Sequence, residues 1–462
     1  MTSDVLALLP EVWLLVGALV VLLAGSFLPR RRLGRTRVAT LVVLAGSAAS
    51  AAVALTGPTR TVFDDSYLVD PATGAVRLIA AVATALVVLL AGDELAGHVR
   101  QAEICTLLLL ATLGAVVLGG SHDLLLVITG FLLASVPLYA LVGLARTPVA
   151  TEAAMKTYLY GSMFGIVLMV GVVVLYGLGG QTSYGPLAAG LAAAPAGPMI
   201  IGVVALLGGL TFKIGAVPGH FWVPDAAQGG AAFAAAFLTT VPKVGALVAA
   251  YRIVLFLPDA ARAPLLVGLL AVLSMTLGNL AAFGQDDPRR LLGWSTVSQA
   301  GYLLVPVAVA GRSELALPAL LVYLAGYAVT NLAAFAVVAA VPGRRTLSEY
   351  AGLAHGHPWL AGGLLVSLLG LVGTPPTAVF VGKLAVGTAA WDAGGAWLTI
   401  ALLLNSVLSL FYYLRWIAPL LRTAAPVAAA RSWGLRVAVG AGTGSVVLGL
   451  GSAALWQLFG SR

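Results

Sequence analysis

The stretch of sequence that decides the fold spans residues 157–212 and reads TYLYGSMFGIVLMVGVVVLYGLGGQTSYGPLAAGLAAAPAGPMIIGVVALLGGLTF. These 56 residues contain no Asp, Glu, Lys, Arg or His. A helix that crosses the hydrocarbon core of a bilayer needs about 20 consecutive apolar residues. An uncharged run of this length therefore predicts an integral membrane protein.

The composition of the whole chain agrees with this prediction. Of 462 residues, 60% are apolar and 9% are charged, and the mean hydropathy is +1.03. A soluble domain carries about 25% charged residues, so soluble, secreted and disulfide-scaffold classes are excluded. The single cysteine, Cys105, excludes a disulfide or an iron–sulfur cluster built by this chain alone. We attribute the formal charge of +8 to cytoplasmic loops and expect no nucleic acid partner.

Length sets the number of membrane crossings. At about 33 residues for each span and its loop, the chain has room for about 14 helices, and runs that are apolar all round favour helices over a barrel. The sequence predicts an all-α integral membrane protein in the lipid bilayer. The expected segments lie near 10–28, 38–56, 75–92, 103–120, 123–143, 152–177, 198–217, 229–257, 263–284, 290–311, 315–342, 359–389, 394–421 and 434–457.

The distribution of arginines predicts the orientation. With an outside N-terminus, fifteen arginines fall on the inside: Arg30, Arg31, Arg32, Arg35, Arg37, Arg100, Arg146, Arg289, Arg290, Arg344, Arg345, Arg415, Arg422, Arg431 and Arg436. Six fall in outside loops and ends: Arg60, Arg77, Arg252, Arg262, Arg312 and Arg462. Because positive loops stay in the cytoplasm, both termini are expected outside.

Two apolar segments are expected to be broken. Residues 358–391 would form a helix of about 51 Å, against a hydrocarbon core of about 30 Å, and Gly373-Thr374-Pro375-Pro376 interrupts them midway. The seventh segment runs directly into residues 215–220, GAVPGH. One break in each half of the chain is typical of transporters built from repeats.

Lysine usage is the most informative chemical pattern. The 25 basic residues include only four lysines, Lys156, Lys213, Lys243 and Lys383, and all four lie inside or one turn into apolar segments. Arginine keeps its proton, whereas a desolvated lysine can lose its proton near neutral pH. The pattern therefore indicates reversible protonation within the membrane, and hence proton or cation transfer.

Each of these residues also has a structural interpretation. Glu152 lies four residues before Lys156, so the two could simply pair at the rim, and Lys243 could extend to an interface. Lys213 and Lys383 have no acidic residue within a helical turn, and each lies at an expected break. His220 could be a loop histidine or a proton relay near Lys213.

Sites for other chemistry are not expected. His355 and His357 lie in a loop without further ligands nearby, so metal binding is not predicted. No flavin motif, dinucleotide fingerprint or nucleophile–base constellation is present, so the chain alone is not expected to be a redox enzyme or to bind a cofactor.

A series of motifs resembles the antiporter-like membrane subunits of respiratory complex I. Residues 212–225 (FKIGAVPGHFWVPD), 239–243 (TTVPK) and 289–302 (RRLLGWSTVSQAGY) recur in the order of that family, as do residues 349–353 (EYAGL), 374–383 (TPPTAVFVGK) and 405–415 (NSVLSLFYYLR). Tyr327, Asn331 and Phe335 fit its eleventh helix. Lysine rather than glutamate at position 383 points to the N type of these subunits.

The resemblance implies 14 helices with two inverted five-helix repeats and breaks in helices 7 and 12. It divides the chain into helices 1–3 (residues 1–100), a first repeat (101–260), a second repeat (261–422) and a last helix (423–462). The chain would hold no redox centre, whereas NADH, flavin, iron–sulfur clusters and quinone would bind to partner membrane and peripheral subunits. Its location would be the inner or plasma membrane of the cell.

The resemblance also assigns a proton pathway. Lys213 would be the central lysine of the first repeat, Lys383 that of the second, and Lys243 the connector. Glu152 and Lys156 match the opening of helix six, and His220 follows the first break.

Two departures from the family pattern are visible. Leu132 stands where helix five normally carries a glutamate that pairs with the lysines, and Gly229–Ala234 replaces a proline-containing segment. Without that acid, Lys213 is expected to lack a carboxylate partner within the chain, and Leu132→Glu is expected to restore one.

The sequence therefore predicts a subunit that moves protons through a line of buried lysines while quinone is reduced elsewhere in an NADH-quinone oxidoreductase. Two alternatives stay open. One is a subunit of a multisubunit cation/proton antiporter or membrane hydrogenase, and the other is a structural spacer that has lost transport.

Overall fold

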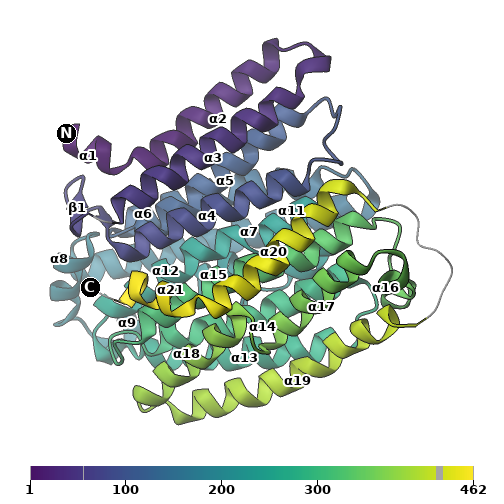
Figure 1. The fold of residues 1–462 in the computed structure, drawn as a ribbon. Helices are drawn as coiled ribbons and strands as arrows, with labels where there is room; N and C mark the ends of the chain where they lie inside the picture. The colour runs from purple at the N-terminus through teal and green to yellow at the C-terminus, as the bar shows by residue number, and fades with distance from the viewer. Residues whose placement is uncertain (1, 56, 423–429, 461–462) are drawn as a thin grey trace.

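The computed structural model describes residues 2–55, 57–422 and 430–460. Figure 1 shows long helices running side by side in one bundle. The elements up to residue 256 are α1 (Thr2–Ala7), α2 (Leu9–Phe27), a 3-10 turn (Arg30–Arg32), α3 (Gly34–Ala54), β1 (Arg60–Val62), β2 (Tyr67–Val69), α4 (Pro71–Leu90), α5 (Gln101–Gly120), α6 (Leu124–Gly143), α7 (Pro148–Gly179), α8 (Tyr184–Leu191), α9 (Ala196–Ile214), α10 (Trp222–Gly229), α11 (Ala232–Leu238) and α12 (Val241–Phe256).

The remaining elements are a 3-10 turn (Asp259–Ala261), α13 (Ala263–Phe283), α14 (Pro288–Ala308), α15 (Ala316–Ala340), a 3-10 turn (Leu347–Tyr350), α16 (Leu353–Gly356), α17 (Pro358–Val372), α18 (Ala378–Asp392), α19 (Ala396–Leu420), α20 (Ser432–Leu450) and α21 (Ser452–Gly460). The two strands form an antiparallel hairpin in which Thr61 pairs with Leu68.

The all-α membrane architecture is confirmed. Within the described residues, 12 helices are long and apolar enough to cross a bilayer, and α17 is a shorter apolar helix. The polar helix α14 and the broken pair α17–α18 would complete the expected 14 crossings, a count that remains a prediction. The division of the chain into two repeats also remains a prediction.

Both expected breaks are present, and each has the same local cause. α9 ends at Gly215 and α17 ends at Gly373, with φ values of 74° and 94°. This left-handed conformation suits glycine, and it stops a helix by turning the chain away from the axis. The next half-helices, α10 and α18, begin at Trp222 and Ala378.

A third interruption differs from the prediction of one continuous segment over residues 229–257. α11 ends at Leu238 and α12 begins at Val241, with Thr239 and Thr240 between them. Pro242 lies in the first turn of α12, where its missing N–H costs no hydrogen bond. Because proline is tolerated at a helix start, it marks a new helix here.

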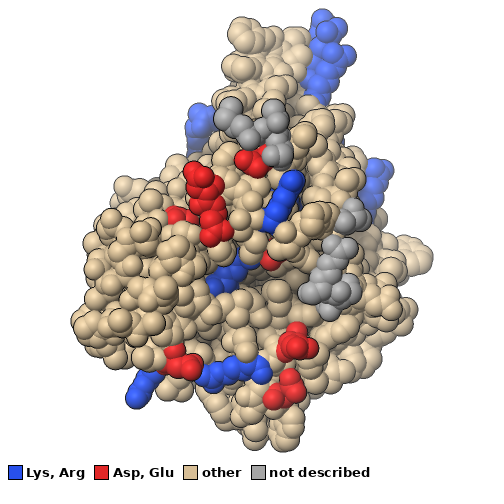
Figure 2. Space-filling model, turned by 90° about the vertical axis from the view of Figure 1, so that its left-hand side faces the viewer, with Lys and Arg blue, Asp and Glu red and all other residues tan. Residues whose placement is uncertain are grey.

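Loop contacts support the alternation of the predicted sides. At one end of the bundle, Arg37 lies over the ring of Trp433, and the backbone N–H of Trp433 donates to Asp93. At the other end, Tyr67 bridges to Ser121. Both termini lie at this second end, at the left of Figure 1, and Figure 2 shows that end with acidic and basic side chains interspersed.

The most buried helices occupy the centre of the bundle. In the apolar stretch of α11–α12 and in that of α15, 94% of the residues are buried within the described structure, compared with 33% in α2. Close backbone contact makes this centre dense, since a Cβ on Gly245 of α12 would lie 1.8 Å from the carbonyl oxygen of Ala115 on α5. The centre of the bundle is therefore where any enclosed polar path has to run.

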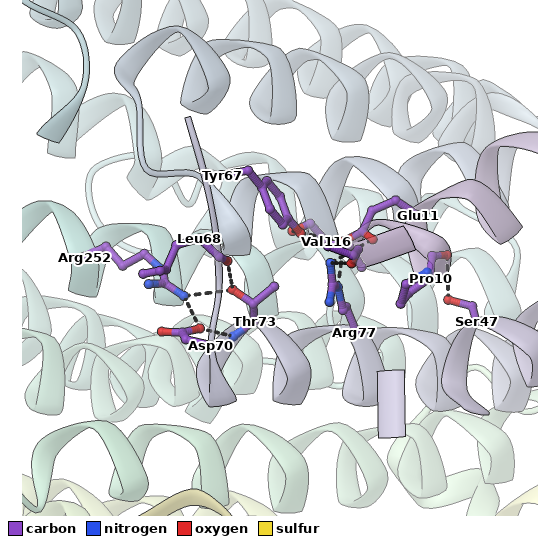
Figure 3. Close-up of polar contacts among 11 residues, drawn as sticks. Pro10, Glu11, Ser47, Tyr67, Leu68, Asp70, Thr73, Arg77, Val116 and Arg252 are labelled. Atoms are coloured by element: carbon purple, nitrogen blue, oxygen red, sulfur yellow. Dashed lines mark hydrogen bonds and ion pairs between the residues drawn. The ribbon is translucent and has the colours of Figure 1, made fainter. Parts of the chain in front are cut away.

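Two of the six arginines assigned to outside loops are instead buried inside helices. Arg77 of α4 forms a two-pronged ion pair with Glu11 of α2, with N–O distances of 2.7 and 2.9 Å, and the Tyr67 hydroxyl donates to the same carboxylate (Figure 3). Arg252 of α12 pairs with Asp70 at 2.7 Å. The sequence did not reveal either ion pair because the acidic partners lie far away along the chain.

Candidate functional site

Lys213 lies in the last turn of α9, directly before the first break. It is 2% exposed, and its Nζ donates to Ser135 Oγ of α6 over 2.6 Å. The rings of Phe131 and Phe212 lie 5.0 and 5.4 Å from the ammonium. Within the described residues Lys213 forms no ion pair, which agrees with the expected absence of a carboxylate partner.

The first break is closed by side chains that cap its free backbone groups. Thr211 Oγ1 accepts from the N–H of Gly219, and Ser274 Oγ accepts from the N–H of Val217. The indole N–H of Trp222 donates to the carbonyl oxygen of Phe212 over 3.1 Å. The carbonyl oxygens of Thr211 and Phe212 in the last turn of α9 thus have donors other than the Lys213 ammonium.

His220 follows this break but makes no hydrogen bond to Lys213 within the described part of the chain. It is buried against Phe221 and Trp294, with ring centroids 4.3 and 5.7 Å apart, and its Nδ1 has no partner among the described atoms. The structure therefore shows packing for His220 and no direct relay contact.

Lys243 lies at the start of α12, beside the third interruption. It is 1% exposed, and its Nζ donates to the Thr296 carbonyl oxygen and the Tyr327 hydroxyl, each over 3.4 Å. Its side chain therefore points into the bundle, and the alternative in which it extends to an interface is wrong.

Lys383 lies on α18 and reaches back across the second break. Its Nζ donates to the carbonyl oxygens of Val372 and Leu371 over 2.8 and 3.2 Å, and it lies 4.0 Å from the ring centroid of Tyr302. It also lines a cavity of about 400 Å³ together with Trp391.

Lys243 and Lys383 are linked through α14. Thr296 of α14 accepts from Lys243, and Gln299, three residues further on, donates to the Leu371 carbonyl oxygen over 2.8 Å. The same oxygen accepts from Lys383. The Tyr323 hydroxyl holds the Gln299 amide in this position over 2.6 Å.

Glu152 and Lys156 form the expected pair, with an N–O distance of 2.7 Å. Asp225 extends it, since one of its oxygens lies 2.9 Å from Lys156 and the other 2.5 Å from Arg290. A cavity of about 240 Å³ opens among these four charged residues.

Sequence reasoning missed several functional contacts. Ser135, Asp225, Gln299 and Tyr302 were not predicted as partners, although three of them stand in the quoted motifs. The signal in the sequence was the run of polar residues in α14. Polar side chains inside a membrane are costly, so this run predicts polar partners on neighbouring helices.

Known proteins share this architecture and much of the sequence. A family described as NADH:quinone oxidoreductase/Mrp antiporter, transmembrane, matches residues 121–409. Subunit N of NADH-quinone oxidoreductase from Mycobacterium sp. (strain JLS) is 54% identical over 97% of both chains.

Solved structures give the same result. A chain of respiratory complex I from Thermus thermophilus with bound aureothin superposes with a TM-score of 0.85 at 30% identity, covering 98% of this chain and 99% of that one. A chain of the Mrp complex from Dietzia sp. DQ12-45-1b has a TM-score of 0.87 at 22% identity, covering 100% and 97%, and shows the shared fold. The chain belongs to the subunit N family of NADH-quinone oxidoreductase, among the antiporter-like membrane subunits of respiratory complex I.

Proposed function

We propose that this chain moves protons across the membrane while partner subunits carry electrons from NADH to quinone. Lys243 and Lys383 are the groups that change protonation, and α14 passes protons between them. The observation that carries the proposal is the chain of contacts Lys243–Thr296 and Gln299–Leu371–Lys383 inside an apolar bundle. Buried lysines that are hydrogen-bonded inside an apolar bundle, with polar groups of one helix between them, are suited to proton transfer.

The remaining assignments belong to the same proposal. Lys156, Glu152 and Asp225 form a charged entrance, and Lys213 and His220 serve the first half. NADH, flavin, iron–sulfur clusters and quinone bind to partner subunits. Both termini face the outside of the inner or plasma membrane, as the excess of arginines on the opposite side predicts.

The test uses the intact complex in proteoliposomes, with proton uptake and NADH oxidation recorded together. Gln299→Leu removes the contact with Leu371 and adds no charge, so proton uptake per NADH oxidised should fall. Gln285→Leu is the matched control, because Gln285 donates only to the nearby Ala281 carbonyl oxygen. If Gln299→Leu moves protons as the parent does, the path through α14 is wrong.

One observation favours a second candidate, that the first half is a spacer. Lys213 has a hydroxyl and two rings around it, and no described hydrogen bond connects it to Lys243. If Lys213→Ala leaves proton uptake unchanged while Gln299→Leu reduces it, transport is confined to the second half.

A further inference from the structure

A basic cavity lies at the end of the bundle opposite the termini, next to the charged entrance of Glu152, Lys156 and Asp225, with which it shares Val149 and Gln228 as lining residues. It encloses about 470 Å³ and is lined by four arginines and two carboxylates: Arg289, Arg344, Arg345, Arg431, Glu94 and Asp287. These residues come from four separate connections between helices, which the fold gathers at this end. Arg289, Arg344 and Arg431 are half-buried and Arg345 is exposed, and the four like charges repel one another around the cavity. A bound anion would compensate for this charge.

The arginines keep many hydrogen-bond donors free. Arg289 and Arg344 each use one terminal nitrogen on a backbone oxygen, of Gly230 and Ala351 respectively. Arg431 lies 3.8 Å from Glu94, which is too far for a hydrogen bond. The Arg345 guanidinium makes no hydrogen bond or ion pair within the described part of the chain. Because each guanidinium carries five N–H donors, most of those lining the cavity have no protein acceptor.

Two carboxylates can neutralise only part of the charge of four arginines. Asp287 caps α14, where its Oδ1 accepts from the backbone N–H groups of Arg289 and Arg290, and its Oδ2 accepts from Gln228. For Glu94, burial raises the pKa of the carboxyl despite the opposing attraction of Arg431 and Arg289. The cavity therefore keeps a positive charge.

Small residues line one side of the basic cavity. Gly229, Gly230, Ala231 and Ala232 form one wall, and they belong to the segment in which this chain lacks the prolines of its family pattern. A Cβ on Gly229 would lie 2.8 Å from the carbonyl oxygen of Val149, and one on Gly230 would lie 2.9 Å from that of Ala226, so glycine allows this wall to pack closely against its neighbours.

We propose that this cavity binds a phosphate group, carried by an anionic phospholipid or present as free phosphate. The planar guanidinium fork matches two phosphate oxygens at once, and basic pockets near the membrane surface commonly bind phospholipid headgroups. The lysines and acids of the proposed proton path do not line this cavity, so the assignment does not depend on transport.

The test measures the protection of an introduced cysteine in the purified complex. Ala145 is exposed and lines the cavity, so Ala145→Cys reports access by its rate of alkylation, read at the level of the peptide. Phosphatidylglycerol in mixed micelles should slow alkylation, and phosphatidylcholine should not. Arg345→Gln should weaken the protection by about ten-fold, the loss of one charge-assisted contact, whereas Arg31→Gln, an exposed arginine outside the cavity, should leave it unchanged.

A comparison with inorganic phosphate distinguishes a phospholipid headgroup from free phosphate. Protection by phosphatidylglycerol alone assigns the site to a lipid, and equal protection by inorganic phosphate assigns it to the free anion. Absence of protection by either, or equal protection in Arg345→Gln, overturns the proposal. If the cysteine is unreactive in every condition, phosphorus analysis decides: one phosphate fewer per complex in Arg345→Gln supports the site, and equal content overturns it.

Discussion

The two helix breaks look alike in the backbone and differ in what their ends bind. Both half-helices end in a left-handed glycine, Gly215 or Gly373, whose N–H turns back onto the preceding turn. At the first break the indole N–H of Trp222 donates to the carbonyl oxygen of Phe212, and the described hydrogen bond of the Lys213 ammonium is to the Ser135 hydroxyl. At the second, the last carbonyl oxygens are left for Lys383.

We expect this difference to change how well each break stabilises a lysine cation. The carbonyl end of a helix carries partial negative charge, so α17 stabilises an ammonium placed directly against it. A neutral hydroxyl and two aromatic faces stabilise a buried charge far less. The proposed proton transfer is therefore expected to depend more on the second break than on the first.

The largest effect is expected from Lys383→Met. The substitution removes the titratable group and adds no buried charge, so the proton uptake that is coupled to this subunit should be abolished while the complex still assembles. Lys383→Arg should also fail, because a guanidinium keeps its proton. Proton uptake in proteoliposomes measures both, and normal uptake with arginine would contradict reversible protonation at this position.

A smaller effect is expected from Ser135→Ala. It removes the one side chain that accepts from Lys213, so any transport through the first half should fall roughly up to ten-fold. Ser135→Thr keeps the hydroxyl and is the matched control. Equal proton uptake in all three proteins would mean that the first half does not transport.

Leu132→Glu should change proton uptake less than Ser135→Ala. Leu132 is 41% exposed, whereas the buried Ser135 occupies the position beside the ammonium. A carboxylate at 132 therefore starts on the outer surface of α6. If Leu132→Glu increases proton uptake by more than Ser135→Ala reduces it, the glutamate reaches Lys213. The first break would then contribute more to transport than its contacts suggest.

Cysteine labelling tests the inverted relation of the breaks without disturbing transport. Ala193 precedes α9 and Gly356 precedes α17, and both are exposed. If the broken helices run in opposite directions, Ala193→Cys and Gly356→Cys should react with an impermeant thiol reagent from opposite sides. Labelling from the same side would contradict inverted repeats.

The sequence predicts what depends on local chemistry and misses what depends on distant partners. Gly373 to Pro376 predicts a break because glycine and proline act within one turn, and the four lysines stand out by their rarity. Ser135 could not be found, since it lies 78 residues from Lys213. The partner of Arg77 was missed for the same reason, because Glu11 lies 66 residues away.

Biogenesis has to accommodate the buried Arg77–Glu11–Tyr67 cluster. Neither α2 nor α4 can rest alone in lipid at low cost, because each carries a charge that only the other neutralises. We therefore expect α2 to remain at the insertion machinery, or at the membrane surface, until α4 has been synthesised. Insertion of the N-terminal helices is thus expected to be a concerted event, and a ribosome stalled before residue 77 should leave α2 accessible to protease.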